Sequence, residues 1–194
     1  MEDIADILEA SVSQGRFKLN KGGNSPVKFE IENALLSAED RKVIAHELEE
    51  ILEFIDEETG KRAVPVCILG GGGLLGTLLD RDIILYQPGR KGKTEAFFGS
   101  LPSLDLKKVE PVIVEDVTTT YNTIGLCAKA MRQYLPKEKM IRGIVLIKRK
   151  ESENKKYAKV LQEHNLKIYP SCVMNFVIHT GEGAEVFVKR YRKY

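Results

Sequence analysis

The chain has 194 residues, 43% of them hydrophobic, which suffices for one compact domain with a continuous buried core but not for two full domains. Thirty basic residues against 28 acidic ones leave a net charge of only +2, so overall charge gives no support to nucleic acid or an anionic membrane as the main partner. No stretch approaches the roughly 20 apolar residues of a membrane helix, no apolar segment follows Met1, and Cys67, Cys127 and Cys172 are spaced as reduced thiols are, which together predict a cytoplasmic protein.

The first predicted elements are a turn and a long helix. Gly22-Gly23-Asn24 is typical of a turn with positive φ. Residues 37–58 place their apolar side chains on one helical face, and Ser37 and Asp40 suit the start of a helix. This helix is expected to cover one face of a sheet.

Continuous apolar runs predict the strands of that sheet. The first three runs end at a glycine run, a Gln-Pro-Gly turn and a pair of acids, and the fourth follows Pro136. The runs are 64–69, 82–86, 111–114 and 141–147. Such runs are typical of parallel strands buried on both faces, so the sequence predicts one doubly wound α/β domain over 1–194.

A strand, a polar turn and a helix follow one another around residue 116. The helix is predicted over 122–135 by its apolar spacing, and Pro136 ends it. In open α/β sheets, ligands bind at the carboxyl ends of the strands. The turn between 114 and 122 is therefore the expected site.

The segment 112–123 carries two carboxylates followed by four threonine hydroxyls. Backbone amides and hydroxyls at a helix start favour a phosphate, and adjacent carboxylates accept hydrogen bonds from sugar hydroxyls or metal-bound water. The alternative is an acidic turn before an ordinary helix cap made by Thr119 or Asn122. The whole combination indicates a phosphorylated sugar.

The run Val-Ile-Val-Glu-Asp-Val-Thr-Thr-Thr at 112–120 resembles the motif by which type I phosphoribosyltransferases bind 5-phosphoribosyl 1-diphosphate (PRPP). This resemblance implies that Glu115 and Asp116 hold the ribose hydroxyls, with Asp116 also among the catalytic residues. It implies a group of residues around the 5′-phosphate: Thr118, Thr119, Thr120, Tyr121, Asn122 and Thr123. It implies Mg²⁺ that arrives with PRPP and has no direct protein ligand.

Two further segments resemble the same family. Residues 15–26 resemble the orotate phosphoribosyltransferase pattern Phe-x-Leu-x-Ser-Gly-x-x-Ser-Pro, which makes Lys21, one place later than the family's lysine, the base-binding candidate. The glycine run after 64–69 offers the unhindered amides of Gly70, Gly71 and Gly72 to a pyrophosphate.

A basic run resembles the family's loop that neutralises the departing pyrophosphate. Arg90 and Lys91 are the expected pyrophosphate contacts, and Lys93 and Lys91 are the catalytic candidates. The alternative interpretation is a solvated loop.

The sequence departs from the family at two places. The phosphate loop reads Thr120-Tyr121-Asn122-Thr123 where the family has Thr-Gly-Gly-Ser, so the Tyr121 ring either blocks the phosphate pocket or reshapes it. The basic loop continues as Thr94-Glu95-Ala96 where the family has x-His-Gly. No arginine for reading orotate follows the phosphate loop, where Leu126 stands.

The resemblance implies a type I phosphoribosyltransferase fold: a mostly parallel five-strand sheet flanked by helices, with a hood from about 1–36 and a candidate contribution from the C-terminal segment. It implies an enzyme that joins a pyrimidine base, with orotate expected, to PRPP and releases pyrophosphate, acting as a homodimer without nucleic acid or membrane partners. The main alternative is a catalytically impaired sensor of PRPP or a nucleotide; a purine phosphoribosyltransferase is the third. A glycine match at Gly71, Gly73 and Gly76 to the dinucleotide fingerprint is weak, because the next strand ends in Gln87 rather than an acid.

Overall fold

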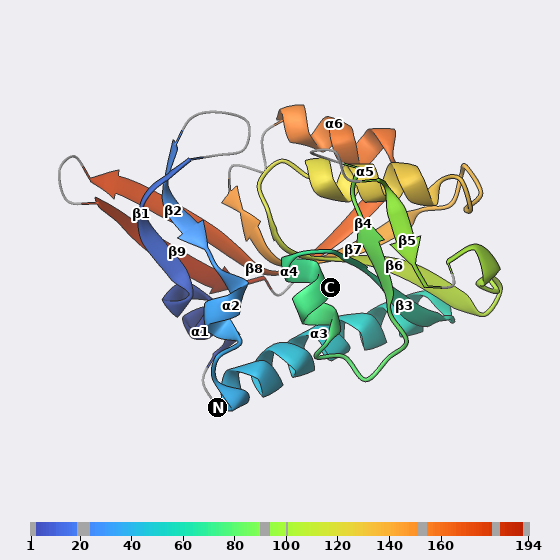
Figure 1. Ribbon diagram of the computed structural model, residues 1–194, viewed down its shortest axis with the longest axis horizontal. Coiled ribbons are helices and arrows are strands. Elements are labelled where there is room, and N and C mark those ends of the chain that lie inside the picture. Colours follow the sequence, from blue (N-terminus) through green and yellow to red (C-terminus); the bar gives the residue numbers. More distant parts are fainter. Residues whose placement is uncertain are drawn as a thin grey trace.

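A twisted seven-stranded sheet forms the centre of the protein, with the strands in the order β5-β4-β3-β6-β7-β8-β9 (Figure 1). The computed structural model describes residues 3–18, 24–89, 94–99, 101–150, 155–179 and 183–191. Five neighbouring strands are parallel: β4 (Ile84–Gln87), β3 (Arg62–Ile68), β6 (Val109–Thr118), β7 (Ile141–Arg149) and β8 (Leu166–His179). They correspond to the predicted five-strand sheet, with the chain crossing from β4 back past β3 to reach β6.

Two antiparallel strands at the edges bring the sheet from the expected five strands to seven. β5 (Ala96–Phe98) pairs with β4, and β9 (Gly183–Arg190) pairs with the distal half of β8. β5 is only three residues long, and β9 alternates exposed and buried positions, so neither presents the continuous apolar run of a central strand.

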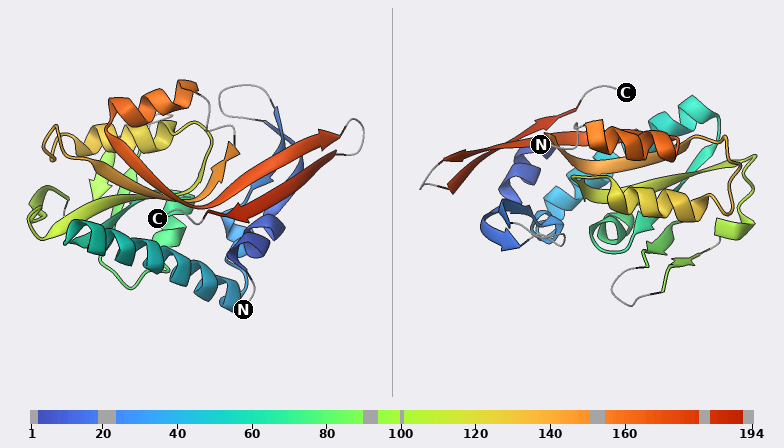
Figure 2. Two further views of the ribbon diagram at one scale, coloured as in Figure 1. Left: turned by 180° about the vertical axis from the view of Figure 1, so that it is seen from behind. Right: turned by 90° about the horizontal axis from the view of Figure 1, so that it is seen from above.

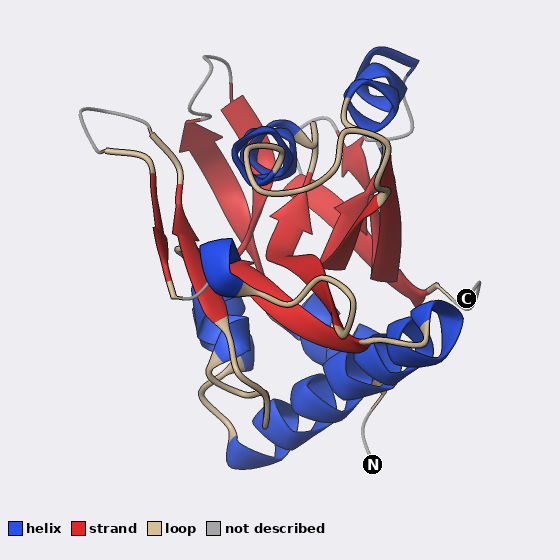
Figure 3. Ribbon diagram, turned by 90° about the vertical axis from the view of Figure 1, so that its right-hand side faces the viewer, coloured by secondary structure: helices blue, strands red, loops and turns tan. Residues whose placement is uncertain are grey.

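Helices cover both faces of the sheet (Figure 3). One face carries α3 (Ala38–Thr59), capped as predicted by the Ser37 hydroxyl, which accepts from the Asp40 amide at 3.3 Å. Gly60 ends α3 in the left-handed conformation with φ 64°. The buried stripe of α3 packs on the sheet, and its apolar members are Ile44, Leu48, Ile51, Leu52 and Ile55.

The other face of the sheet carries α5 (Asn122–Met131) and α6 (Lys155–Glu163). The helix predicted over 122–135 ends four residues early, and the chain turns while keeping Leu135 buried in the same core. Two short helical segments lie in the connections between strands. They are α4 (Gly71–Gly76) after β3 and the 3₁₀ turn η1 (Leu101–Ser103) before β6.

A hood stands beside the sheet and combines the two ends of the described chain (Figure 2). Its N-terminal elements are α1 (Ile4–Ala10), β1 (Val12–Lys18), β2 (Asn24–Phe29) and α2 (Ile31–Ala34). β1 and β2 form an antiparallel pair, and α1, β1 and β2 all contact β9. Ile7, Leu8 and Phe29 share one buried cluster with Val188 of β9. The C-terminal hairpin of β8 and β9 therefore packs with these N-terminal elements.

A polar network joins the last turn of α3 to the first residues of β7 and β8. The Glu58 carboxylate accepts hydrogen bonds from Arg142 Nε at 3.1 Å, from the Tyr169 hydroxyl at 2.5 Å and from Lys167 Nζ. Arg142 also donates to Glu110 at 3.0 Å. The network lies at the amino ends of the strands. Among the described residues, none of the helices is both long and apolar enough to cross a membrane.

Candidate functional site

The two segments singled out from the sequence meet at the switch point of the sheet. The chain leaves β3 toward β4 on one side and returns to β6 on the other, so the carboxyl ends of β3 and β6 form the topological switch point at which open α/β folds hold ligands, called the strand-end crevice below. The glycine run follows β3, and the acid and threonine run ends β6. Figure 1 shows α4, which begins in the glycine run, lying against β6.

Glycine is required where α4 crosses the end of β6. A Cβ on Gly71 would lie 2.1 Å from the Asp116 carboxyl carbon, and one on Gly72 would lie 2.4 Å from the Val114 carbonyl oxygen. Both distances are far below van der Waals contact, so a larger residue at 72 would force the two segments apart and one at 71 would displace the Asp116 side chain. The backbone of the predicted pyrophosphate loop therefore touches the predicted sugar-binding acid.

The two carboxylates lie side by side but in different surroundings. Glu115 is buried, and Asp116 is partly buried against the glycine run. Burial raises the pKa of Asp116 above its ordinary value, while hydrogen bonds from the Glu115 side chain and the Val117 amide oppose that rise. Polyol hydroxyls that donate to the Asp116 carboxylate would replace the water it has lost.

The turn between β6 and α5 is tied together by its own hydroxyls. Thr118 Oγ1 accepts from the Tyr121 amide at 3.2 Å, and Thr120 Oγ1 accepts from the Asn122 side chain. The Gly125 amide donates to the Tyr121 carbonyl at 2.7 Å. The amides of the first turn of α5 point out of the helix end, as in any helix, and carry its partial positive charge toward the crevice.

The position of the Tyr121 ring bears on whether this residue blocks the phosphate pocket or reshapes it. Its backbone adopts φ 54° and ψ 9°, the left-handed conformation that a glycine would supply, and its side chain is only 3% exposed. The ring belongs to the core cluster beneath α5, with Ile124 and Ile113. Burial of an aromatic ring contributes about 2 kcal/mol, which offsets a left-handed backbone cost on the order of 1 kcal/mol. The ring therefore packs in the core, which favours the interpretation that it reshapes the turn over the one in which it blocks the phosphate pocket.

Four predicted residues lie outside the part of the chain that the structure describes: Lys21, Arg90, Lys91 and Lys93. The residues that flank the basic run are described. The Gln87 side chain donates to the Thr94 carbonyl at 2.8 Å, and the Tyr86 hydroxyl donates to Glu95 Oε1 at 2.8 Å. Because β4 runs parallel to β3, its carboxyl end, from which the basic run departs, lies at the same edge of the sheet as the crevice.

Sequence reasoning missed a pair of cations at this edge. Lys148 and Arg149 end β7, and Lys148 lies in register with Thr118 of β6. Both side chains are partly buried. The available signal was the same as for β6, an apolar strand that ends abruptly in charged residues. Among the described residues, no group of three or more His, Cys, Asp or Glu side chains could hold a metal ion.

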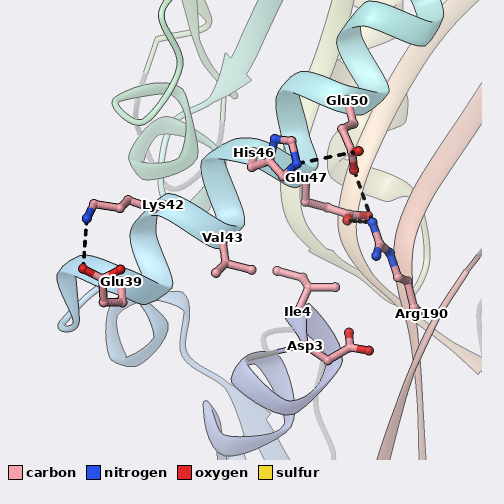
Figure 4. Close-up of a pocket in the computed structure, with 9 residues that line it drawn as sticks. All are labelled: Asp3, Ile4, Glu39, Lys42, Val43, His46, Glu47, Glu50 and Arg190. Carbon is pink, nitrogen blue, oxygen red and sulfur yellow. Dashed lines mark hydrogen bonds and ion pairs between the residues drawn. The ribbon is translucent and has the colours of Figure 1, made fainter. Parts of the chain in front are cut away.

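A second hollow lies away from these residues, between α3, α1 and the end of β9 (Figure 4). It has a volume of about 550 Å³, and none of its lining residues belongs to the strand-end crevice. Arg190 reaches across it to Glu47 at 2.5 Å and Glu50 at 3.2 Å, and Ser171 donates to Glu47 at 2.8 Å. These bonds join the hood hairpin to α3. His46 is largely exposed on the rim, 3.7 Å from Glu50.

Comparisons with known proteins find matches among solved structures but none among family models or curated proteins. No protein-family model matches the sequence. A comparison with curated proteins likewise finds no match. An orotate phosphoribosyltransferase from Aeropyrum pernix matches with a TM-score of 0.60 and 23% identity, covering 86% of this chain and 91% of that one.

Two further structures extend the likeness. An orotate phosphoribosyltransferase from Mycobacterium tuberculosis in complex with PRPP matches with a TM-score of 0.56 and 15% identity, over 86% of this chain and 91% of that one. An adenine phosphoribosyltransferase from Giardia lamblia complexed with 9-deazaadenine matches with a TM-score of 0.58 and 13% identity, over 88% and 98% of the two chains. The shared fold extends over most of this chain.

Proposed function

Since the chain has the type I phosphoribosyltransferase fold, we propose that it transfers the phosphoribosyl group of PRPP to a pyrimidine base, with orotate as the expected substrate, and releases pyrophosphate. The observation that carries the proposal is the contact between Gly71 and Asp116 at the switch point. A pyrophosphate-sized anion and a ribose need adjacent binding groups, and this contact makes the glycine amides and the acid pair neighbours.

Each part of PRPP has a matching group in this arrangement. The turn Thr118, Thr119, Thr120, Tyr121, Asn122 and Thr123 would hold the 5′-phosphate through its amides and hydroxyls. Glu115 and Asp116 would accept from the ribose hydroxyls, and Gly70, Gly71 and Gly72 would leave room for the pyrophosphate. Two carboxylates also suit Mg²⁺ that keeps several waters and is held chiefly by the substrate's phosphates, so the residues fit that ion.

In the proposed reaction a nitrogen of the base attacks the anomeric carbon of PRPP as the bond from that carbon to the pyrophosphate oxygen breaks. Positive charge develops on the ribose ring, and negative charge develops on the leaving pyrophosphate. The protein's part is positioning and charge stabilisation, for which Arg90, Lys91 and Lys93 are the candidates on the pyrophosphate side.

The described cations at the strand ends favour an anionic base. Orotate carries a carboxylate, and Arg149 is the guanidinium that β7 brings to the edge of the crevice. Adenine has no such anion, although an adenine phosphoribosyltransferase shares the fold. We therefore infer orotate over a purine, and a cytoplasmic homodimer of single-domain chains as the resemblance implies.

One observation favours a second candidate, a PRPP sensor without turnover. Glu95 stands where the family's loop carries histidine, and the Tyr86 hydroxyl holds its carboxylate at 2.8 Å. A negative charge at this edge would oppose the charge that develops on pyrophosphate.

The test is pyrophosphate release from PRPP with Mg²⁺ against orotate, uracil, adenine and hypoxanthine, alongside calorimetric titration of PRPP. Release with orotate alone supports the proposed reaction, and release with a purine alone corrects the base. PRPP binding without release for any base supports the sensor. Absence of both binding and release contradicts both candidates.

A further inference from the structure

We propose that Tyr121 is a positioning residue that holds the turn between β6 and α5 in its phosphate-binding conformation. The proposal rests on the proposed function, since it assigns to one side chain the order of the loop that would bind the 5′-phosphate. The sequence alone suggested that the Tyr121 ring could block the phosphate pocket. In this proposal the ring instead stabilises the turn between β6 and α5.

The backbone of Tyr121 sets the direction of the turn. Among the described residues, Tyr121 and Asn165 are the non-glycine residues with positive φ, and asparagine adopts that region far more readily than tyrosine does. The left-handed conformation directs the Tyr121 amide to Thr118 Oγ1 at 3.2 Å and its carbonyl to the Gly125 amide at 2.7 Å. These two bonds fix the end of β6 relative to the first turn of α5.

The ring keeps this conformation in place. It is 3% exposed and packs in the cluster that contains Ile113 of β6, Ile68 of β3 and Ile124 of α5. To leave the left-handed region, the backbone would have to withdraw the ring from that cluster and expose its apolar surface to water. The core therefore stabilises a backbone conformation that tyrosine disfavours by itself.

Glycine would permit the same turn but would not maintain it. A glycine at 121 adopts the left-handed conformation and many others, and it leaves a cavity under α5 where the ring had packed. The fraction of molecules with a competent loop would fall, and the apparent Kd for a phosphorylated ligand would rise in proportion.

The experiment compares Tyr121→Phe, Tyr121→Gly and Tyr121→Ala with the unchanged protein. PRPP and ribose 5-phosphate affinities are measured by calorimetry with Mg²⁺, and amide exchange at Gly125 is followed by NMR. We expect the glycine and alanine variants to bind roughly tenfold more weakly with faster Gly125 exchange, and Tyr121→Phe, which keeps the ring, to lose less affinity than either.

Met131→Ala is the matched control, because Met131 is fully buried in the same cluster but lies at the far end of α5. It should lower thermal stability while leaving Kd and Gly125 exchange unchanged. This separates loop positioning from a general loss of stability.

The outcomes distinguish this proposal from the proposed function. Equal or tighter PRPP binding by Tyr121→Gly, or an equal loss in Met131→Ala, overturns the positioning role. Failure of the unchanged protein to bind PRPP contradicts the proposed function. In that case unchanged Gly125 exchange in Tyr121→Gly also overturns the anchoring role, and selectively faster exchange supports it.

Discussion

At Asp116, burial opposes the negative charge that the proposed sugar binding needs. The carboxyl lies against Gly71, and its pKa is raised because the surroundings disfavour the ionised form. A carboxyl with a raised folded-state pKa binds its proton more tightly when folded, so its contribution to stability falls as pH rises from the ordinary value through the raised one. At neutral pH the ionised Asp116 carboxylate therefore destabilises the fold, at the position where the proposed function needs its charge.

Asp116→Asn should accordingly weaken PRPP binding without lowering thermal stability. The amide keeps the shape of the side chain but loses two lone-pair acceptors for hydroxyls, and a loss of roughly 10- to 100-fold in affinity is expected. Calorimetry and thermal unfolding at pH 7 measure the two effects. Asp82→Asn, at a 92% exposed side chain, is the control that should change neither. A destabilised variant with normal affinity would contradict this account.

Arg149→Gln should affect the base and spare PRPP. If the guanidinium pairs with the carboxylate of orotate, its removal raises the KM for orotate by roughly 10- to 100-fold, because a charge-assisted hydrogen bond is lost. The PRPP Kd should remain within about twofold. Lys150→Gln, one residue further along and exposed, serves as the control. An equal loss for PRPP and orotate would place Arg149 on the phosphates instead.

Among the elements, the crossing of α4 over the end of β6 limits what the glycine run tolerates. A Cβ on Gly72 would meet the Val114 carbonyl oxygen at 2.4 Å, while one on Gly73 would find its nearest neighbour, Leu69, at an ordinary 3.6 Å. Adjacent glycines in one short helix thus have opposite requirements. Gly72 must lack a side chain because α4 lies against the β6 backbone there, whereas the packing leaves room for a side chain at position 73.

Gly72→Ala should lower the melting temperature by about 2–10 °C, since overpacking against backbone costs roughly 1–3 kcal/mol. Gly73→Ala should leave the melting temperature unchanged or raise it, because alanine favours a helix by about 1 kcal/mol over glycine. Differential scanning calorimetry of the pair is the measurement. Equal melting temperatures for both variants would mean that α4 moves freely relative to β6.

The central elements were predictable because their sequences are locally consistent. α3, β3, β4, β6 and β7 were expected within a few residues, since apolar runs and a helical stripe follow directly from burial on both faces or on one. The type I phosphoribosyltransferase fold was also predicted and is confirmed. β5 and β9 were less visible because edge strands need no continuous apolar run.

The arrangement of elements around the candidate site was predictable in outline but not in detail. Strand, acid pair and helix start identified the segment around residue 116, because ligand position at strand ends follows from topology. The direction of the Tyr121 ring depends on a backbone conformation that residue type disfavours, so only tertiary packing decides it. Lys148 comes beside Thr118, with Arg149 as the next residue of β7, through strand pairing between distant segments, which spacing along the chain does not reveal.

For the molecule as a whole, the Glu58 network links one helix to two strands at the edge opposite the crevice. Hydrogen bonds from Lys167 and Tyr169 lower the pKa of Glu58 to about 2. A carboxyl with a depressed folded-state pKa stabilises the fold fully above its ordinary pKa of 4.5, and that contribution is lost as pH falls from there toward 2.

Glu58→Gln should therefore flatten the acid limb of the stability curve between about pH 5 and pH 2. Because Glu58 is partly exposed and screened by water, the stability difference at pH 7 is expected to be about 1 kcal/mol or less. Chemical denaturation at pH 7 and pH 3 measures it, with Glu57→Gln on the exposed side of the same turn as the control. A steeper acid loss in the variant would contradict the direction of this shift.

β8 belongs to the sheet and to the hood at once, and this has a consequence for synthesis on the ribosome. The hood's N-terminal elements emerge from the ribosome before the sheet, but Ile7, Leu8 and Phe29 share their buried cluster with Val188 of β9, which emerges after all the parallel strands. The bond between Glu9 and the Val188 amide spans 179 positions. The parallel strands can pair while the chain is still growing, whereas the hood's apolar face stays exposed to solvent until β9 has been made. A nascent chain stopped before β9 could thus pair its parallel strands but would leave the apolar side chains of the hood's N-terminal elements exposed. Exposed apolar surface of this kind is what chaperones recognise.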